Sequence, residues 1–224
     1  MTPHSSQPLQ ALVQQLLTGG LTELGAKRVP TGIRKNPVTQ AELTSTGFMG
    51  DAQGDRKHHG GTEKAVHQYC LDHYPFWRDA IGSVEPLAQP GAFGENLVVS
   101  GLTEDDVCIG DTWAVGDALL QVSQARRPCW RLNERFGVRD MARRVTETGR
   151  TGWYYRVLTP GIVATGDTLE LRERPHPEWP LSRLFRVLLQ DRPHPPTLEA
   201  VAGLTLLSNS WRDLARQRAA NGKK

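Results

Sequence analysis

Turn-forming residues interrupt this chain along its whole length. It has 22 glycines and 15 prolines among 224 residues, a share of about 17% where about 12% is usual. So many turn-forming residues exclude a long-helix or coiled-coil protein. They favour many short elements, hence a β-rich mixed α/β fold. The length suffices to bury the core of one large domain without disulfide or metal staples.

Several classes of protein are disfavoured by what the sequence lacks. It has no run of about 18 apolar residues, so we expect no membrane span and no membrane partner. Its first ten residues do not resemble a secretory signal. Three cysteines are too few for a disulfide framework and indicate a reducing compartment, which predicts a cytoplasmic protein.

The N-terminal part of the chain reads as strands interrupted by one helix. Residues 24–50 alternate short apolar stretches with glycine and proline, which predicts short strands and loops. Thr62 is a good N-cap, and apolar residues at helical spacing after it predict a helix from 62 to about 72. A short helix is also compatible with residues 9–17.

The second half predicts strands, then helices. Residues 97–99 form a β run, and Gly116-Asp117 between apolar stretches indicates a hairpin. Residues 128–149 read as helical, followed by strands to Leu171. A linker rich in proline and charge then leads into three short helices at 180–190, 197–204 and 210–219. We therefore predict a barrel-like β domain over 1–172, with its core from about 25, and a helical appendage over 173–224.

Cys129 is the residue with the clearest chemical signal. Pro128 suits the first position of a helix, which would place Cys129 in the first turn, where the helix dipole favours an anion. Arg126 and Arg127 precede it, and cationic neighbours also favour a thiolate that serves as nucleophile or metal ligand. Cys70 and Cys108, by contrast, lie among apolar residues and are predicted to be core.

A second candidate site is the glycine-rich segment 56–64. Gly60 and Gly61 lead into a predicted helix start and expose backbone N–H groups, and basic side chains flank them: Arg56, Lys57, His58, His59 and Lys64. This composition suits an anion, most simply a phosphate, although the Walker pattern is missing. The alternative is a glycine turn on a basic surface.

Two other readings compete with these sites. His67, Cys70 and His73 are spaced by three and would share a helix face as zinc ligands, but no second pair completes the set. The last predicted helices carry Arg212, Arg216 and Arg218, which is compatible with a nucleic-acid-binding or adaptor protein. A solvated basic face is the simpler interpretation, and we expect no nucleic acid partner.

The charge distribution supports an anionic ligand near Cys129. Residues 121–160 contain nine arginines, no lysine and three acidic residues. The guanidinium group is the side chain best suited to fork-like binding of phosphate or carboxylate.

Five sequence blocks together resemble the MOSC family, named for the C-terminal domain of molybdenum cofactor sulfurases. They are HHGGTEKAV (58–66), PGAFGENL (90–97), GLTE (101–104), IGD (109–111) and RPC (127–129). Their order and the C-terminal helices look most like the YiiM branch, from about Gly25 to the end of the chain. The resemblance implies a MOSC-type β-barrel-like domain that binds the molybdenum cofactor (molybdopterin), with no need of pyridoxal phosphate.

The resemblance also implies roles for individual residues. Cys129 would be the molybdenum ligand. The cofactor would be bound by Arg56, His58, His59, Gly60, Gly61, Lys64, Asn96, Arg126 and Arg127. His59 is our first candidate for a catalytic proton donor.

The implied activity is reduction of small N-hydroxylated compounds such as 6-hydroxylaminopurine, which detoxifies N-hydroxylated bases. Electrons would come from a separate flavin or iron–sulfur protein. A sulfur carrier that holds a persulfide on Cys129 remains an alternative.

Overall fold

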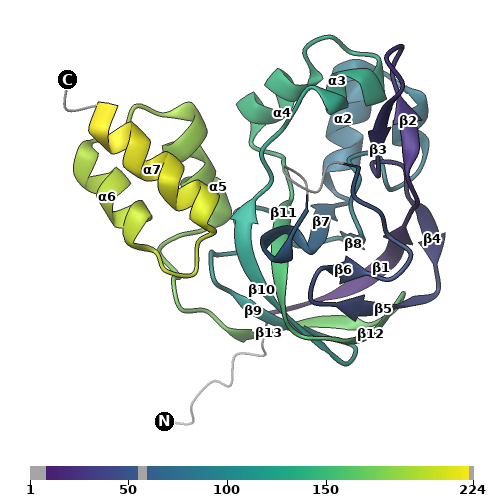
Figure 1. The fold of residues 1–224 in the computed structure, drawn as a ribbon, viewed down its shortest axis with the longest axis horizontal. Helices are drawn as coiled ribbons and strands as arrows, with labels where there is room; N and C mark the ends of the chain where they lie inside the picture. The colour runs from purple at the N-terminus through teal and green to yellow at the C-terminus, as the bar shows by residue number, and fades with distance from the viewer. Residues whose placement is uncertain (1–8, 55–59, 222–224) are drawn as a thin grey trace.

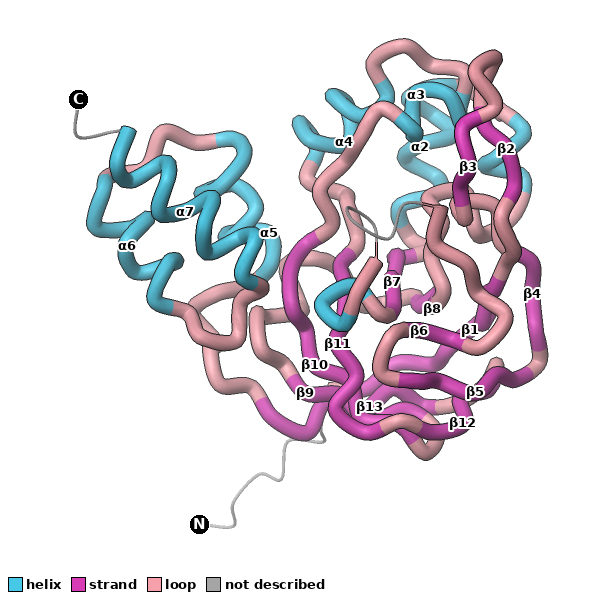
Figure 2. The backbone as a smooth tube through the Cα atoms, in the orientation of Figure 1, coloured by secondary structure: helices cyan, strands magenta, loops and turns pink. Residues whose placement is uncertain are grey.

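Seven strands close into a barrel in the order β13, β9, β10, β11, β7, β8 and β1, and pairing of β13 with β1 completes the ring. The structure is a computed structural model that describes residues 9–54 and 60–221. All neighbouring barrel strands are antiparallel except β7 and β8. Figures 1 and 2 show the barrel with helices at its upper edge and a separate group of helices beside it.

The strands are β1 (Gln10–Thr18), β2 (Thr22–Leu24), β3 (Val29–Thr31), β4 (Asn36–Val38), β5 (Gln40–Thr44), β6 (Gly47–Phe48), β7 (Val66–Cys70), β8 (Leu97–Val99), β9 (Thr112–Val115), β10 (Ala118–Ala125), β11 (Trp153–Thr159), β12 (Gly161–Ala164) and β13 (Thr168–Glu173). The helices are η1 (Thr62–Lys64), α2 (His73–Ile81), η2 (Glu85–Ala88), α3 (Arg131–Phe136), α4 (Met141–Thr148), α5 (Leu181–Phe185) with its π-helical continuation η3 (Arg186–Gln190), α6 (Pro195–Gly203) and α7 (Asn209–Asn221). Outside the barrel ring, β4 adds to β1, β12, β5 and β6 form a small sheet, and β2 pairs with β3.

The predicted hairpin and the predicted helical region after the barrel strands are confirmed. Gly116-Asp117 joins β9 to β10, and Gly116 has φ +53°, which a tight two-residue turn requires. Residues 128–149 contain two helices, because Gly137 ends α3 in the left-handed conformation and Gly149 does the same for α4. The short strands expected in 24–50 are also present.

The helix predicted from Thr62 to about residue 72 is wrong. The chain makes only the three-residue 3₁₀ turn η1 there and then enters β7, whose five residues are all buried. β7 lies between β11 and β8 in the barrel. A strand buried on both faces shows no alternation, so its sequence pattern does not separate it from a buried helix.

The short helix considered for residues 9–17 is also wrong. This segment forms β1, which pairs with β8, β13 and β4. The barrel therefore includes residues upstream of position 25, and Val13, Leu16 and Leu17 are completely buried.

The C-terminal helices pack against the barrel. One continuous hydrophobic cluster joins barrel residues such as Trp113 to helix residues such as Leu184 and Trp211. The backbone N–H of Ser208 donates to the Ser123 carbonyl at 2.9 Å, and Arg156 Nη2 donates to the Leu206 carbonyl at 2.9 Å. Among residues 9–54 and 60–221, no helix has the length and apolar character that crossing a membrane requires.

Candidate functional site

A cavity opens at the end of the barrel where β7 and β11 begin and β10 ends. Its volume is about 620 Å³, including the part open to solvent. Four predicted site residues line this cavity together: Lys64, Asn96, Arg126 and Cys129. They come from η1, the loop before β8 and the segment after β10, so residues far apart in sequence meet only through the barrel.

Three other predicted site residues, Arg127, Gly60 and Gly61, are not brought into this wall. Arg127 is exposed, and Gly60 and Gly61 precede η1 without lining the cavity. Arg56, His58 and His59 lie outside the described residues. Their predicted roles in binding the cofactor, and that of His59 as proton donor, stay predictions.

Cys129 lies on the cavity wall, but not in the first turn of a helix as its sequence predicts. Helix α3 begins at Arg131, and Cys129 precedes its N-cap residue Trp130. The Cys129 carbonyl accepts a hydrogen bond from the Leu132 N–H at 3.0 Å, which fixes the segment at the helix start.

Cys70 and Cys108 differ from Cys129, as predicted. Both side chains are buried, and burial raises the pKa of Cys70 to about 12 and that of Cys108 to about 11. Cys129 is partly exposed, and none of the three forms a disulfide. The thiol positioned for chemistry with a ligand is therefore the Cys129 thiol.

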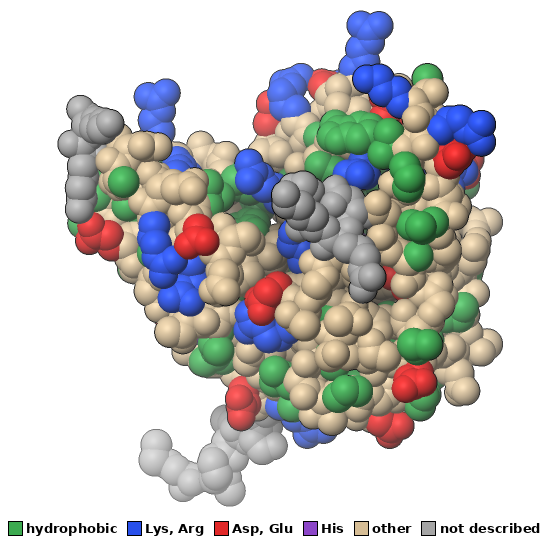
Figure 3. Space-filling model, viewed as in Figure 1, with side chains coloured by type: hydrophobic (Ala, Val, Ile, Leu, Met, Phe, Trp, Pro, Cys, Tyr) green, Lys and Arg blue, Asp and Glu red, His purple; other side chains and the backbone are tan. Residues whose placement is uncertain are grey.

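Arg126 brings a buried positive charge to the cavity. The residue is 6% exposed, and its Nη1 atom has no hydrogen-bond partner among the described residues. Its neighbour Tyr154 also lines the cavity; burial raises the pKa of that phenol, and the nearby guanidinium opposes the shift. A buried guanidinium nitrogen that lacks a partner is costly unless an anion accepts a hydrogen bond from it. The space-filling view shows other Lys and Arg side chains gathered around the middle of this face (Figure 3).

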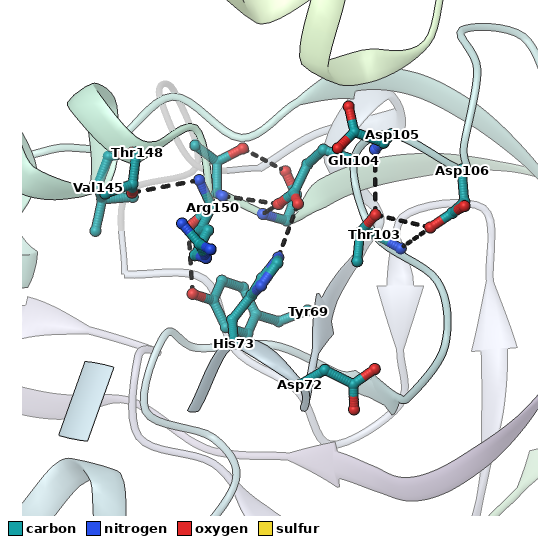
Figure 4. Close-up of polar contacts among 12 residues, drawn as sticks. Tyr69, Asp72, His73, Thr103, Glu104, Asp105, Asp106, Val145, Thr148 and Arg150 are labelled. Carbon is teal, nitrogen blue, oxygen red and sulfur yellow. Dashed lines mark hydrogen bonds and ion pairs between the residues drawn. The ribbon is translucent and has the colours of Figure 1, made fainter. Parts of the chain in front are cut away.

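A buried carboxylate, that of Glu104, stabilises the backbone to which Arg126 is hydrogen-bonded. Glu104 accepts hydrogen bonds from the N–H groups of Thr151 and Gly152 at 2.8 and 2.7 Å, and it pairs with His73 Nε2 at 2.8 Å. Figure 4 shows these contacts converging on the Glu104 carboxylate. The Gly152 carbonyl in turn accepts the Arg126 N–H at 2.9 Å. Glu104 therefore helps fix the backbone that carries Arg126.

Sequence reasoning missed an ion pair in the cavity wall. Lys35 Nζ contacts Asp51 Oδ1, and each side chain is only 6% exposed. Asn96 Nδ2 donates to Asp51 Oδ2 at 2.9 Å and to the Leu17 carbonyl at 3.1 Å. Lys35 and Asp51 stand alone in loops with no motif around them, so only the fold reveals them. The amide protons of Asn96 serve to hold Asp51 and β1.

His67 belongs to this cavity and not to a zinc site. In β7 the side chains of His67 and Cys70 point to opposite faces, and His73 contacts Glu104. Among the described residues, no group of three His, Cys, Asp or Glu side chains is arranged to hold a metal ion. Burial, followed by the nearby charge of Arg126, lowers the pKa of His67 to about 3. The imidazole is therefore neutral at ordinary pH.

The low pKa of His67 predicts acid sensitivity. Between about pH 6.5 and pH 3 the unfolded chain binds a proton at this histidine that the folded chain does not, so acidification lowers the free energy of unfolding. Relative to His67→Gln, the wild type should lose about 1.4 kcal/mol of stability for each pH unit between pH 6 and pH 4.

Urea denaturation at several pH values measures this difference. His194→Gln is the matched control, since His194 is exposed and its side chain makes no capping hydrogen bond. Parallel pH profiles for wild type and His67→Gln would contradict the buried neutral imidazole.

The arginines of the last helix are engaged within the helical module. Arg218 donates to the carbonyls of Val187 and Asp191 at 2.8 and 2.7 Å, and Arg216 pairs with Asp213. Arg212 Nε donates to the Ala202 carbonyl at 3.3 Å. These contacts favour a packing role over a nucleic-acid surface.

The closed barrel thus carries at one end a cavity lined by a thiol and a buried guanidinium, an arrangement that suits an anionic small molecule. A model of the MOSC domain matches residues 55–170. The chain is 42% identical to the uncharacterized protein YflK of Bacillus subtilis, over 85% of each protein. It is 38% identical to a protein of Gibberella moniliformis named Reductase, covering 92% of this chain and 38% of that longer protein. The crystal structure of YiiM from Geobacillus stearothermophilus superposes with a TM-score of 0.79 at 30% identity, covering 93% of this chain and 99% of that one.

The chain belongs to the MOSC domain family and is YiiM-like. The predicted fold class is thereby confirmed. Its function is associated with the molybdenum cofactor.

The residues of the cavity fit that cofactor. Molybdopterin carries a phosphate, and the orphaned Nη1 of Arg126 is a donor for such a group. The Cys129 thiol lies in the same cavity and offers the soft ligand that molybdenum takes. We expect Arg126 and Lys64 to hold the phosphate, and Cys129 to hold the metal.

Proposed function

We propose that this protein is a molybdenum-cofactor-dependent reductase that removes the hydroxyl group from N-hydroxylated bases such as 6-hydroxylaminopurine and so detoxifies them. One observation supports the proposal above all: a single cavity brings Cys129 together with Lys64 and the buried Arg126. The family membership and the relative named Reductase supply the reaction class. The cytoplasmic location suggested by cysteine usage stays a prediction.

The role of each residue in the cavity follows from the position of its side chain. When bound, the cofactor would supply two-electron chemistry at its metal. Cys129 would anchor it, Arg126 and Lys64 would neutralise its phosphate, and the half-buried aromatic ring of Tyr154 bounds the space beside Arg126. The partly open cavity leaves a small planar base room to enter.

Electrons must reach the site from another protein. The common iron–sulfur clusters take four cysteine ligands, whereas this chain has three cysteines, of which two are buried in the core. The sequence also lacks a recognisable flavin motif. We therefore propose a separate flavin or iron–sulfur protein as donor.

The test is reduction of 6-hydroxylaminopurine to adenine under anaerobic conditions, with a reduced viologen dye as electron donor. Protein from a host that makes the cofactor should convert the substrate, with two dye molecules oxidised per adenine formed. The same protein from a host unable to make the cofactor should be inactive. Equal activity from both hosts, or none from either, would contradict the proposal.

A further inference from the structure

Reduction of an N-hydroxyl group needs protons as well as electrons. The balanced reaction is R–NH–OH + 2e⁻ + 2H⁺ → R–NH₂ + H₂O: the N–O bond breaks, and one O–H and one N–H bond form. Hydroxide is a poor leaving group, so a proton delivered to the departing oxygen accelerates the cleavage. A cavity that performs this reaction needs an acid in its wall.

We propose that Lys35 is this acid: its ammonium group gives a proton to the oxygen of the N–OH group as the N–O bond breaks. The Nζ–H bond breaks, an O–H bond of the departing water forms, and the second proton comes from solvent. The two electrons come from the bound cofactor, which a flavin or iron–sulfur donor recharges. This inference rests on the proposed function and adds a catalytic residue to it.

The geometry holds Lys35 in place as an acid. Its side chain is 6% exposed, lines the cavity and pairs with Asp51. Asp51 is itself fixed, because its Oδ1 accepts the Gly19 N–H at 2.9 Å and its Oδ2 accepts from Asn96. An ammonium group has three protons and the ion pair uses one. After transfer, the Asp51 carboxylate favours renewed protonation of the amine.

Its surroundings make Lys35 a stronger acid than an ordinary exposed lysine. Burial lowers the pKa of Lys35, and the carboxylates of Asp51 and Glu95 only partly oppose this. Among the described residues, His67 also lies close enough for the charge of Lys35 to lower its pKa. A lowered pKa brings the group closer to the range where acid catalysis at neutral pH is efficient.

Two other described groups in the cavity, His67 and Tyr154, serve this role less well. His67 is neutral above its pKa of about 3 and has no imidazolium proton to give at ordinary pH. Burial raises the pKa of Tyr154, so the phenol holds its proton more tightly. His59, the candidate from sequence, lies outside the described residues.

Lys35→Arg is the decisive variant because it keeps the charge and removes the transferable proton. On 6-hydroxylaminopurine, kcat should fall about 100-fold or more, with molybdenum per chain unchanged. In the O-acetylated form of the substrate the leaving group is acetate, which needs no proton to depart. On this substrate the kcat of Lys35→Arg should therefore be close to that of the wild type. The matched control is Lys27→Arg, an exposed lysine in the β2–β3 turn, which should leave both rates unchanged.

A second readout does not depend on activity. In protein labelled with [¹³Cε]lysine, six resonances are expected, and the one missing from Lys35→Arg should titrate at the lowest pH. A Lys35 resonance that titrates with the exposed lysines would overturn the proposal.

The kinetic outcomes separate this proposal from its alternatives. Loss of molybdenum in Lys35→Arg would make Lys35 a cofactor anchor, and equal rate losses on both substrates would make it structural; either overturns the acid role. An unchanged rate on 6-hydroxylaminopurine also overturns it, while the proposed function stands. A wild-type protein that does not reduce the substrate removes both proposals together.

Discussion

Cys129→Ser should abolish metal binding and activity while the fold stays intact. Protein from a host that makes the cofactor should carry close to one molybdenum per chain, and the variant should fall about 100-fold or more in retained metal and in N–O reduction. The physical reason is that a serine hydroxyl stays protonated at neutral pH and is a harder, weaker ligand than a thiolate. Elemental analysis of the purified proteins measures the difference.

The fold should survive this change because of where the side chain lies. Cys129 is partly exposed on the cavity wall, outside the regular helix, and not part of the hydrophobic core. We expect the urea midpoint of Cys129→Ser to stay near that of the wild type. Cys108→Ala is the control, because it removes a thiol from the core and should leave molybdenum content unchanged.

The same samples separate the remaining hypotheses. Full molybdenum in Cys129→Ser would contradict the assignment of the metal ligand. Cyanide-labile sulfur on wild-type Cys129 without molybdenum would favour the persulfide carrier. Salt-dependent DNA binding that persists in Cys129→Ser and disappears on deletion of residues 173–224 would favour the nucleic-acid hypothesis.

Sequence patterns predicted the elements whose signals are local. The Gly116-Asp117 turn lies between stretches that already alternate, so the hairpin is encoded within a dozen residues. The helices after residue 130 show an apolar stripe ending in glycine, and its members Leu132, Phe136, Met141 and Val145 are all buried. Neither prediction needs information about distant parts of the chain.

The failures occurred where tertiary pairing decides the conformation. β1 and β7 are barrel strands, and their apolar spacing also fits a helix. The hydrogen bonds to neighbouring strands, among them β8 between β1 and β7, select the extended form. The choice of a strand or a helix there is a property of the whole barrel.

The candidate site shows the same division between local and distant information. Cys129 and Lys64 stand in recognisable sequence blocks, and both line the cavity. Lys35 and Asp51 are separated by 16 positions and meet only in the folded barrel. A buried lysine is readily found in the structure, but its sequence resembles that of any loop lysine.

Removing the Glu104 carboxylate should cost the fold about 3–5 kcal/mol of unfolding free energy. Glu104→Ala leaves three buried partners without an acceptor: the N–H groups of Thr151 and Gly152, and the ring of His73. Each orphaned donor costs about 1–3 kcal/mol. Because a domain of this kind has only about 5–15 kcal/mol in total, the variant should be close to unfolding at 37 °C.

Urea unfolding followed by tryptophan fluorescence measures the loss, with Asp105→Asn as the matched control. Asp105 is the adjacent acidic residue, it is exposed, and its side chain points away from the cluster in Figure 4, so its variant should change stability by less than about 0.5 kcal/mol. Equal stability of Glu104→Ala and Asp105→Asn would mean that water replaces the carboxylate at no cost. In the expected case the loss also loosens the Gly152 carbonyl that holds the Arg126 N–H. Glu104→Gln keeps the shape of the side chain and one acceptor oxygen, so it should recover part of the lost stability. The cofactor content of Glu104→Gln then reports how strictly the position of Arg126 depends on the Glu104 carboxylate.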